Sequence, residues 1–236
     1  MDFKLFKAEE RGVKNAGWLL SNFSFSFSSY SQPDKASFGL LKVFNDDFVE
    51  PGRGFGIHPH YNMEIISIML SGKMNHKDSL GYTEVVEKDW VQIMSAGSGI
   101  RHEEYNIGED EVNFLQIWIE PKLQNINPRY QRRSFPEASR KNSLKTIVSN
   151  EEGTEHCWIN QNAKLSLGSF DEGRELTYTF NSFNKCLYIF VIEGELEIAG
   201  QALKQRDAAG IWNTGAIEVR NTQQSKFLII ETPINH

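Results

Sequence analysis

Residues 54–72 read GFGIHPHYNMEIISIMLSG and hold the two features that decide the fold and the site. The run EIISIML, ending shortly before Gly72, is rich in β-branched and other apolar residues, which indicates a buried strand. His58 and His60 lie just before it, two positions apart. Because successive side chains of a strand alternate between its faces, these two imidazoles would share a face. Convergent imidazoles have metal-ligand geometry, although the pair needs further partners.

The rest of the chain has the same strand character. FSFSFSSY (23–30) alternates phenylalanine with serine, and NFLQIWI (113–119), CLYIFVIEGELEIAG (186–200) and SKFLIIE (225–231) are β-branched or aromatic runs between turn residues. Helical signals are weak, and the best of them, at residues 128–141, indicates a connector. We therefore predict an all-β protein built as sandwiches or barrels.

A loose internal repeat divides the chain. In each half a strand ends at a glycine, a hairpin follows, and an aspartate then precedes a strand that ends at a second glycine. The matching positions are Gly72 and Gly194, Asp89 and Asp207, and Gly97 and Gly215. Two copies of one β unit explain 236 residues better than one barrel does. We expect two β-barrel domains, residues 1–133 and 134–236, joined near residues 134–150.

The two copies differ where a metal would bind. Counting forward 13 residues from Asp89 reaches His102, and the same count from Asp207 reaches Arg220. Counting back from the glycines, His58 and His60 correspond to Phe180 and Ser182. A metal, if present, is therefore expected in the first half alone.

Partners for the histidine pair occur in SAGSGIRHEEYN, residues 95–106. Gly97 and Gly99 permit a tight turn, after which His102, Glu104 and Asn106 would share one face of a strand. His102 and Glu104 thus form a second pair spaced by two residues. The two pairs together are a much more specific signal than either alone.

These motifs resemble a known family. Gly52, His58, His60, Glu64 and Gly72 resemble the first cupin motif, and the segment from Gly97 to Asn106 resembles the second. More closely, GIHPH, NMEI, HKDSLG, QIMSAGSGIRHEEYN, LQIWIEP and NPRYQRR resemble the quercetinase-like bacterial branch of the pirin family, from Arg11 to Phe135. The resemblance implies a bicupin fold with two jelly-roll barrels, of which only the N-terminal one binds metal.

The resemblance also implies the ligands, namely His58, His60, His102 and Glu104. In most cupins the glutamate at the position of Glu64 is the ligand instead, so Glu64 stays an alternative. Strand parity would point Glu64 and Asn62 inward, and with Asn106 they are candidates for supporting the ligands from behind. His76, in the hairpin KMNHKDSLG, is expected on the surface.

Three imidazoles and one carboxylate form a mixed N/O site, which leaves about two positions open on an octahedral metal. The resemblance implies one divalent transition metal, Fe(II) first. Nickel, manganese, cobalt, copper and zinc stay possible, because ligand type does not separate them. A closed structural zinc site is the competing interpretation, although such sites usually include cysteine.

The resemblance implies a dioxygenase that cleaves quercetin or related flavonols and releases carbon monoxide. The substrates would be a flavonol-like aromatic molecule and dioxygen, and Glu104 would serve as the catalytic base. The alternative is a non-catalytic, metal-binding and redox-responsive regulatory protein, as the eukaryotic pirins imply. Oxygen uptake with a flavonol separates the two.

Composition excludes other classes. A net charge of −6 argues against nucleic-acid binding, and Arg129, Arg132 and Arg133 are interpreted as a solvated basic turn. No apolar run approaches the roughly 18 residues of a membrane span. The N-terminus has no secretion signal, and the two cysteines, Cys157 and Cys186, suggest no disulfide framework. We expect a cytoplasmic monomer.

Overall fold

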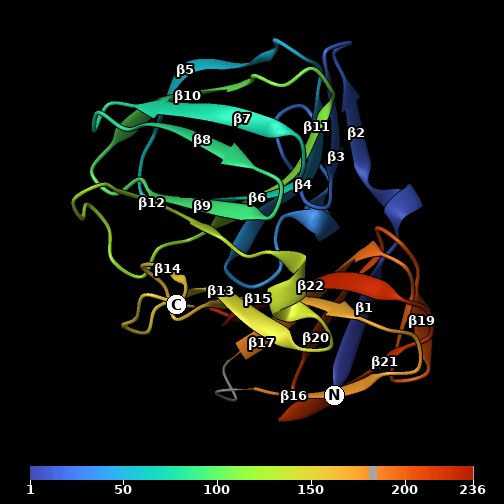
Figure 1. Cartoon of the computed structure of the whole chain (residues 1–236). Helices are drawn as coiled ribbons and strands as arrows, with labels where there is room; N and C mark the ends of the chain where they lie inside the picture. Colours follow the sequence, from blue (N-terminus) through green and yellow to red (C-terminus); the bar gives the residue numbers. More distant parts are fainter. Residues whose placement is uncertain (181–184, 236) are drawn as a thin grey trace.

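The computed structural model describes residues 1–180 and 185–235 and consists almost entirely of β-strands in two stacked domains (Figure 1). Each domain contains one seven-stranded and one four-stranded sheet. The all-β fold predicted from the alternating and β-branched runs is confirmed, as are the two cupin-type domains expected from the internal repeat and the family resemblance.

The first domain contains the strands of the predicted metal motifs. Its large sheet has the order β12 (Arg129–Ser134), β9 (Trp90–Ser95), β6 (Glu64–Ser71), β11 (Val112–Ile119), β4 (Leu41–Val49), β3 (Leu19–Phe23) and β2 (Gly12–Asn15). Its small sheet has the order β5 (Gly54–His60), β10 (Ile100–Asn106), β7 (Lys73–Asp78) and β8 (Thr83–Glu87).

The second domain repeats this plan. Its large sheet has the order β1 (Asp2–Phe6), β20 (Ala208–Trp212), β17 (Lys185–Glu193), β22 (Ser225–Pro233), β15 (Lys164–Phe170), β13 (Leu144–Ser149) and β14 (Cys157–Trp158). Its small sheet has the order β16 (Glu175–Thr179), β21 (Ala216–Asn221), β18 (Leu196–Ile198) and β19 (Gln201–Leu203).

The eight strands from β4 to β11 and the eight from β15 to β22 occupy matching places. The order β9-β6-β11-β4 in one large sheet corresponds to β20-β17-β22-β15 in the other, and β5-β10-β7-β8 corresponds to β16-β21-β18-β19. The loose sequence repeat therefore reflects a repeated topology.

The first strand of the chain belongs to the sheet of the second domain. The N-terminal strand β1 pairs with β20, the place that β12 takes beside β9 in the first domain. Figure 1 shows the dark-blue β1 among the orange and red strands of the lower half. The first residues of the chain thus complete the second domain's sheet, whereas the boundary near residue 133 stays a prediction.

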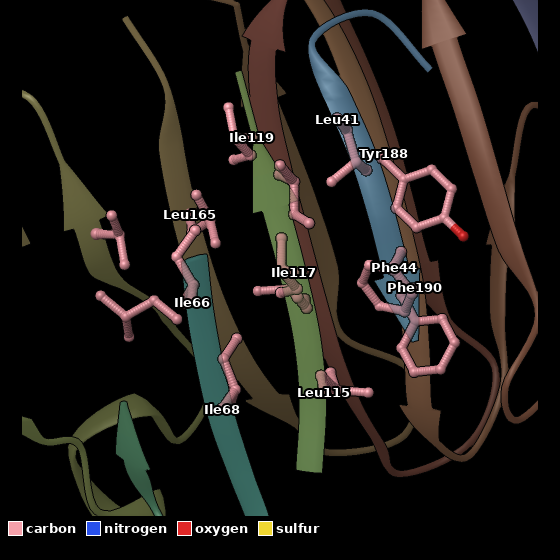
Figure 2. Close-up of a cluster of buried hydrophobic side chains, with 14 of the residues drawn as sticks. Leu41, Phe44, Ile66, Ile68, Leu115, Ile117, Ile119, Leu165, Tyr188 and Phe190 are labelled. Carbon is pink, nitrogen blue, oxygen red and sulfur yellow. The ribbon is translucent and has the colours of Figure 1, made fainter. Parts of the chain in front are cut away.

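The two large sheets pack face to face. Their shared core contains Ile66, Ile117 and Phe44 from the first domain and Leu165 and Phe190 from the second (Figure 2). The Phe44 and Phe190 rings lie 4.7 Å apart between centroids. Because full burial of one such side chain stabilises by roughly 1.5–3 kcal/mol, this interface holds the domains together as one unit.

Helical structure is limited to short 3-10 turns in the part of the chain described: Ala8–Glu10, Pro33–Lys35 and Glu137–Arg140. Residues 128–141, which we interpreted as a connector with weak helical signals, contain strand β12 at residues 129–134 and the 3-10 turn Glu137–Arg140. Within residues 1–180 and 185–235, none of the helices has the length and apolar character required to cross a bilayer.

Candidate metal centre

Antiparallel pairing of β5 with β10 brings the two sequence motifs together. His58 lies directly opposite His102, and His60 lies opposite Ile100. The Nε2 atoms of His60 and His102 are 3.1 Å apart, and ligand nitrogens of His58, His60 and His102 all lie within 4.8 Å of one another. The structure therefore gathers the three predicted histidines at one point.

The glycine turn before β10 makes this approach possible. Gly97 has a φ of 46° and Gly99 a φ of 134°, conformations that disfavour other residues. A β-carbon at Gly97 would overlap the carbonyl oxygen of Ile126, and one at Gly99 would lie 2.6 Å from the ring of Tyr61. Both glycines of the motif are thus required by geometry.

The imidazoles are prepared to ligate rather than to carry charge. Burial, with the neighbouring histidines, lowers the pKa of His60 to about 4, and burial likewise lowers that of His102 to about 4. His58 Nδ1 lies 2.7 Å from the carbonyl oxygen of Gly56, so its N–H donates there and leaves Nε2 free. Near pH 7 the His60 and His102 imidazoles are therefore neutral.

Glu104 lies beside this cluster and is buried. Its carboxylate forms a second group of potential ligands with His102 and His76, again within 4.8 Å, so His102 belongs to both groups. Gln92 Nε2 donates a hydrogen bond to Glu104 Oε1. Burial alone would raise the pKa of Glu104, but His76, His102 and Gln92 outweigh it and lower the pKa to about 2. Glu104 is thus an ionised carboxylate.

The prediction that His76 lies on the surface was wrong. Its side chain is fully buried in β7, directly across from Glu104, with Nδ1 3.8 Å from Glu104 Oε1. Its Nε2 is 2.9 Å from Asp78 Oδ2, and its ring stacks on Tyr130 at 4.2 Å between centroids. The carboxylates of Glu104 and Asp78 outweigh burial and raise its pKa. The alternation of Met74, His76 and Asp78 was the available signal, but the pairing of β7 with β10 was not visible in it.

Tyr130 completes this buried network. Its hydroxyl donates to Gln92 Oε1 at 3.0 Å, and the amide nitrogen of Gln92 donates to Glu104. Tyr130 comes from β12, near the end of the first half of the chain. The Arg-rich segment PRYQRRSF therefore contributes to the site through its tyrosine.

Two of the three supporting candidates, Glu64 and Asn106, make contacts away from the histidines. Glu64 is fully buried and accepts hydrogen bonds from Ser95 Oγ at 2.7 Å and from the backbone N–H of Asn160 at 3.1 Å. Asn106 donates from Nδ2 to the backbone oxygens of Val49 and Asp110. Across the described parts of the chain, neither side chain hydrogen-bonds to His58, His60 or His102.

The strand parity that placed Asn62 toward the metal does not hold. Strand β5 ends at His60, and Asn62 has a φ of 46°. Its amide pairs with Asn125, whose backbone N–H donates to Asn62 Oδ1 at 2.7 Å. Asn62 therefore ties the loop after β5 to the loop that contains Asn125.

The second domain shows which residues replace the histidines. Asn106 and Asn221 are equivalent: both are buried, and their backbone groups bond to Gly52 and Arg53 or to Gly173 and Arg174 in the same pattern.

From that anchor, Ile217 corresponds to His102 and Val219 to Glu104. Tyr178 pairs with Ile217 as His58 pairs with His102. All three replacements lie in the second domain's apolar core.

The equivalences counted from the sequence were therefore shifted. Arg220 is exposed and pairs with Glu175, because only 10 residues separate Asp207 from Ile217, against 13 from Asp89 to His102. Phe180, which the count had matched to His58, is buried but lies two residues after Tyr178, the residue at the equivalent place. Ser182 lies outside the described residues.

A cavity of about 230 Å³ opens beside the histidines, between the two sheets of the first domain. Aromatic and polar side chains share its lining, which consists of Lys14, Leu19, Ser21, Phe23, Phe27, Ser28, Asn45, Asp47, Phe55, His58, His60, Glu104, Gln116 and Trp118. The His60 ring meets Trp118 edge to face, 5.0 Å between centroids. A flat aromatic molecule fits this chemistry.

Family models match both domains. The Pirin model matches residues 6–119, and the model described as quercetinase C-terminal cupin domain matches residues 146–232. A protein named quercetin 2,3-dioxygenase from Escherichia coli (strain K12) is 36% identical over 230 residues, covering 97% of this chain and 98% of that protein. A pirin-like protein from Caulobacter vibrioides is 33% identical over 224 residues, covering 94% and 96%.

Solved structures agree in fold. The bacterial pirin YhhW from Escherichia coli, in complex with nickel(II), superposes with a TM-score of 0.93 at 35% identity, covering 98% of this chain and 99% of that one. A quercetin 2,3-dioxygenase from Acinetobacter baumannii has a TM-score of 0.79 at 18% identity, covering 98% and 86%, which supports the fold alone.

Proposed function

The chain belongs to the pirin family, and on that premise we propose that it is a metal-dependent dioxygenase cleaving quercetin or a related flavonol, with release of carbon monoxide. The observation that carries the proposal is the convergence of His58, His60 and His102, with the ionised Glu104 grouped beside His102, next to an aromatic-lined cavity whose wall includes His58, His60 and Glu104. We further propose that the protein is a cytoplasmic monomer and that it binds neither nucleic acid nor a membrane.

The residues fit a divalent cation. His60 Nε2 and His102 Nε2 lie 3.1 Å apart, a distance at which one ring donates a hydrogen bond to the other, and because both rings are neutral near pH 7 the two nitrogens could instead bind one shared cation. We assign His58, His60, His102 and Glu104 as its ligands and propose Fe(II) as the metal. Mixed N/O donors also suit nickel, manganese, cobalt, copper and zinc.

When bound, the metal would acidify the flavonol hydroxyl that approaches it. The proton leaves to Glu104, which is ionised and is the anionic member of the proposed ligand set. Gln92 and His76 hold the carboxylate in place from behind.

The cavity walls position the substrate. Phe23, Phe27, Phe55 and Trp118 present apolar ring surface on which a flavonol ring system can lie. Substrate orientation thus comes from the wall, and the chemistry comes from the small sheet.

Oxygen consumption tests the proposal. Purified protein loaded with one equivalent of Fe(II) is mixed with a panel of flavonols, and dissolved oxygen and evolved carbon monoxide are followed. We expect uptake that requires both metal and flavonol. Full metal retention without oxygen uptake by any flavonol would contradict an enzymatic role and favour a redox-responsive binding protein.

A further inference from the structure

The cavity has a second polar wall, formed by the large sheet and facing the histidines on the small sheet. Asn45 lies opposite Gln116 across β4 and β11, and Asp47 lies opposite Ser21 across β4 and β3. All four residues line the cavity that also contains His58, His60 and Glu104. The site therefore has polar groups at both ends.

Three acceptor atoms of this wall have no hydrogen-bond partner among the described residues. Asn45 and Asp47 are only 2% and 4% exposed, yet Asn45 Oδ1, Asp47 Oδ1 and Gln116 Oε1 have no hydrogen bond within the described structure. A buried acceptor left unpaired costs about 1–3 kcal/mol. Three such atoms in one cavity are unusual unless something else supplies their donors.

Asp46, between them on the same strand, shows the contrast. Its side chain points to the opposite face of β4 and is fully paired, with Arg206 Nη1 at 3.0 Å, Asn113 Nδ2 at 2.8 Å and Arg11 Nη1 at 3.5 Å. The fold thus satisfies the buried acid that faces the second domain. By contrast, Asn45 Oδ1 and Asp47 Oδ1, on the face toward the cavity, have no hydrogen-bond donor among the described residues.

Unpaired acceptors require a ligand that donates, and hydroxyl groups on an aromatic ring meet that need. Trp118 Nε1 is an unpaired donor in the same cavity, and Phe23, Phe27 and Phe55 supply flat apolar contact. Burial raises the pKa of Asp47 to about 7, against the effect of Ser21, so near neutral pH this carboxyl can both accept and donate.

We propose that Asn45, Asp47 and Gln116 bind the hydroxyl groups at the end of the substrate remote from the metal, and so select polyhydroxylated aromatic substrates over the same ring system without those hydroxyls. The inference rests on the proposed function, because it assumes that the opposite end of the substrate lies at the histidines. Beyond the proposed function, it identifies the residues that determine which substrate is bound.

The test compares binding of quercetin with binding of 3-hydroxyflavone, which keeps the metal-directed hydroxyl and lacks the others. Dissociation constants are measured by tryptophan fluorescence on Fe(II)-loaded protein without oxygen, so that no turnover occurs. The variants are Asn45→Leu and Gln116→Leu, and the matched control is Gln223→Leu, an exposed glutamine of the second domain.

We expect the wild type to bind quercetin about tenfold or more tightly than 3-hydroxyflavone. Each wall variant should reduce this ratio about fivefold, as for loss of one hydrogen bond, and Gln223→Leu should preserve it. Gln116→Leu should also melt at the same or a higher temperature than the wild type, because it removes an unpaired buried acceptor.

Equal binding of the two flavonols, or a ratio unchanged in both wall variants, overturns the inference. Selective binding without oxygen uptake supports the wall and contradicts the proposed enzymatic function. Oxygen uptake without selective binding supports the proposed enzymatic function and contradicts the role of the wall. Failure of one proposal is therefore distinguishable from failure of the other.

Discussion

The two domains share one strand plan and differ in what fills it. In the first, the interior beside the small sheet holds His58, His102 and Glu104 next to a cavity. In the second, the corresponding positions hold Tyr178, Ile217 and Val219, packed in an apolar core. The fold therefore does not depend on the polar cluster, because the same topology forms where the corresponding residues belong to an apolar core.

The largest expected effect is the loss of activity in His58→Ala. Turnover should fall by more than about 100-fold, because nothing replaces the missing imidazole, while the cooperative melt stays near the wild-type temperature. Burial in the shared core far outweighs one ligand lost from a cavity wall. The measurements are thermal melts, metal content and oxygen uptake. Loss of the cooperative transition would falsify the catalytic assignment and favour a structural metal, whose binding energy is folding energy.

A pair of glutamate variants sharpens the ligand assignment. Glu104→Gln should weaken metal retention about 10–100-fold, because it removes the anionic donor beside His102. Glu64→Gln should retain most of the metal, since Glu64 bonds to Ser95 and to the second domain. Metal content after dialysis ranks the two variants. The reverse ranking means that this chain ligates through Glu64, as most cupins do.

A substitution in the second domain should have the reverse effect, lowering stability while metal binding and activity are kept. Ile217→Ala should destabilise the protein by about 2–5 kcal/mol through the cavity it creates, because Ile217 is buried in the apolar core. Metal content and the rate per folded molecule should stay at wild-type values. Denaturant unfolding supplies the free energy, and a loss of metal in this variant would show that the domains are not functionally separate.

The smallest expected effect is a pH dependence of stability from Glu64. Burial raises its pKa to about 7, from an ordinary value of 4.5, against the hydrogen bonds from Ser95 and Asn160. Between these values the folded state holds a proton that the unfolded state has lost, so stability falls as pH rises from about 5 to about 7. Glu64→Gln should flatten this slope in melts at pH 5 and pH 8. If the slope is unchanged in this variant, the pH dependence of stability arises from a group other than Glu64.

Sequence patterns predict the fold and part of the site because both are local. The β-branched runs indicate strands, and the i, i+2 spacing of His58 with His60 and of His102 with Glu104 places each pair on one strand face. Strand pairing is not local, and this explains why His76 was misplaced: its burial follows from lying opposite Glu104.

Two further features depend on distant pairing. The N-terminal strand β1 completes the large sheet of the second domain, although its sequence DFKLF does not indicate that β20 is the strand with which it pairs. The unpaired wall of Asn45, Asp47 and Gln116 is recognisable only once hydrogen-bond partners can be counted in space.

The most direct test of the account is a titration of metal-free protein with Fe(II) while oxygen uptake on quercetin is recorded. We predict that the uptake rate rises with added metal and reaches a plateau at about one equivalent per chain, since the proposed ligand set lies in the first domain. No uptake at any metal level, or a plateau at about two equivalents, would contradict it.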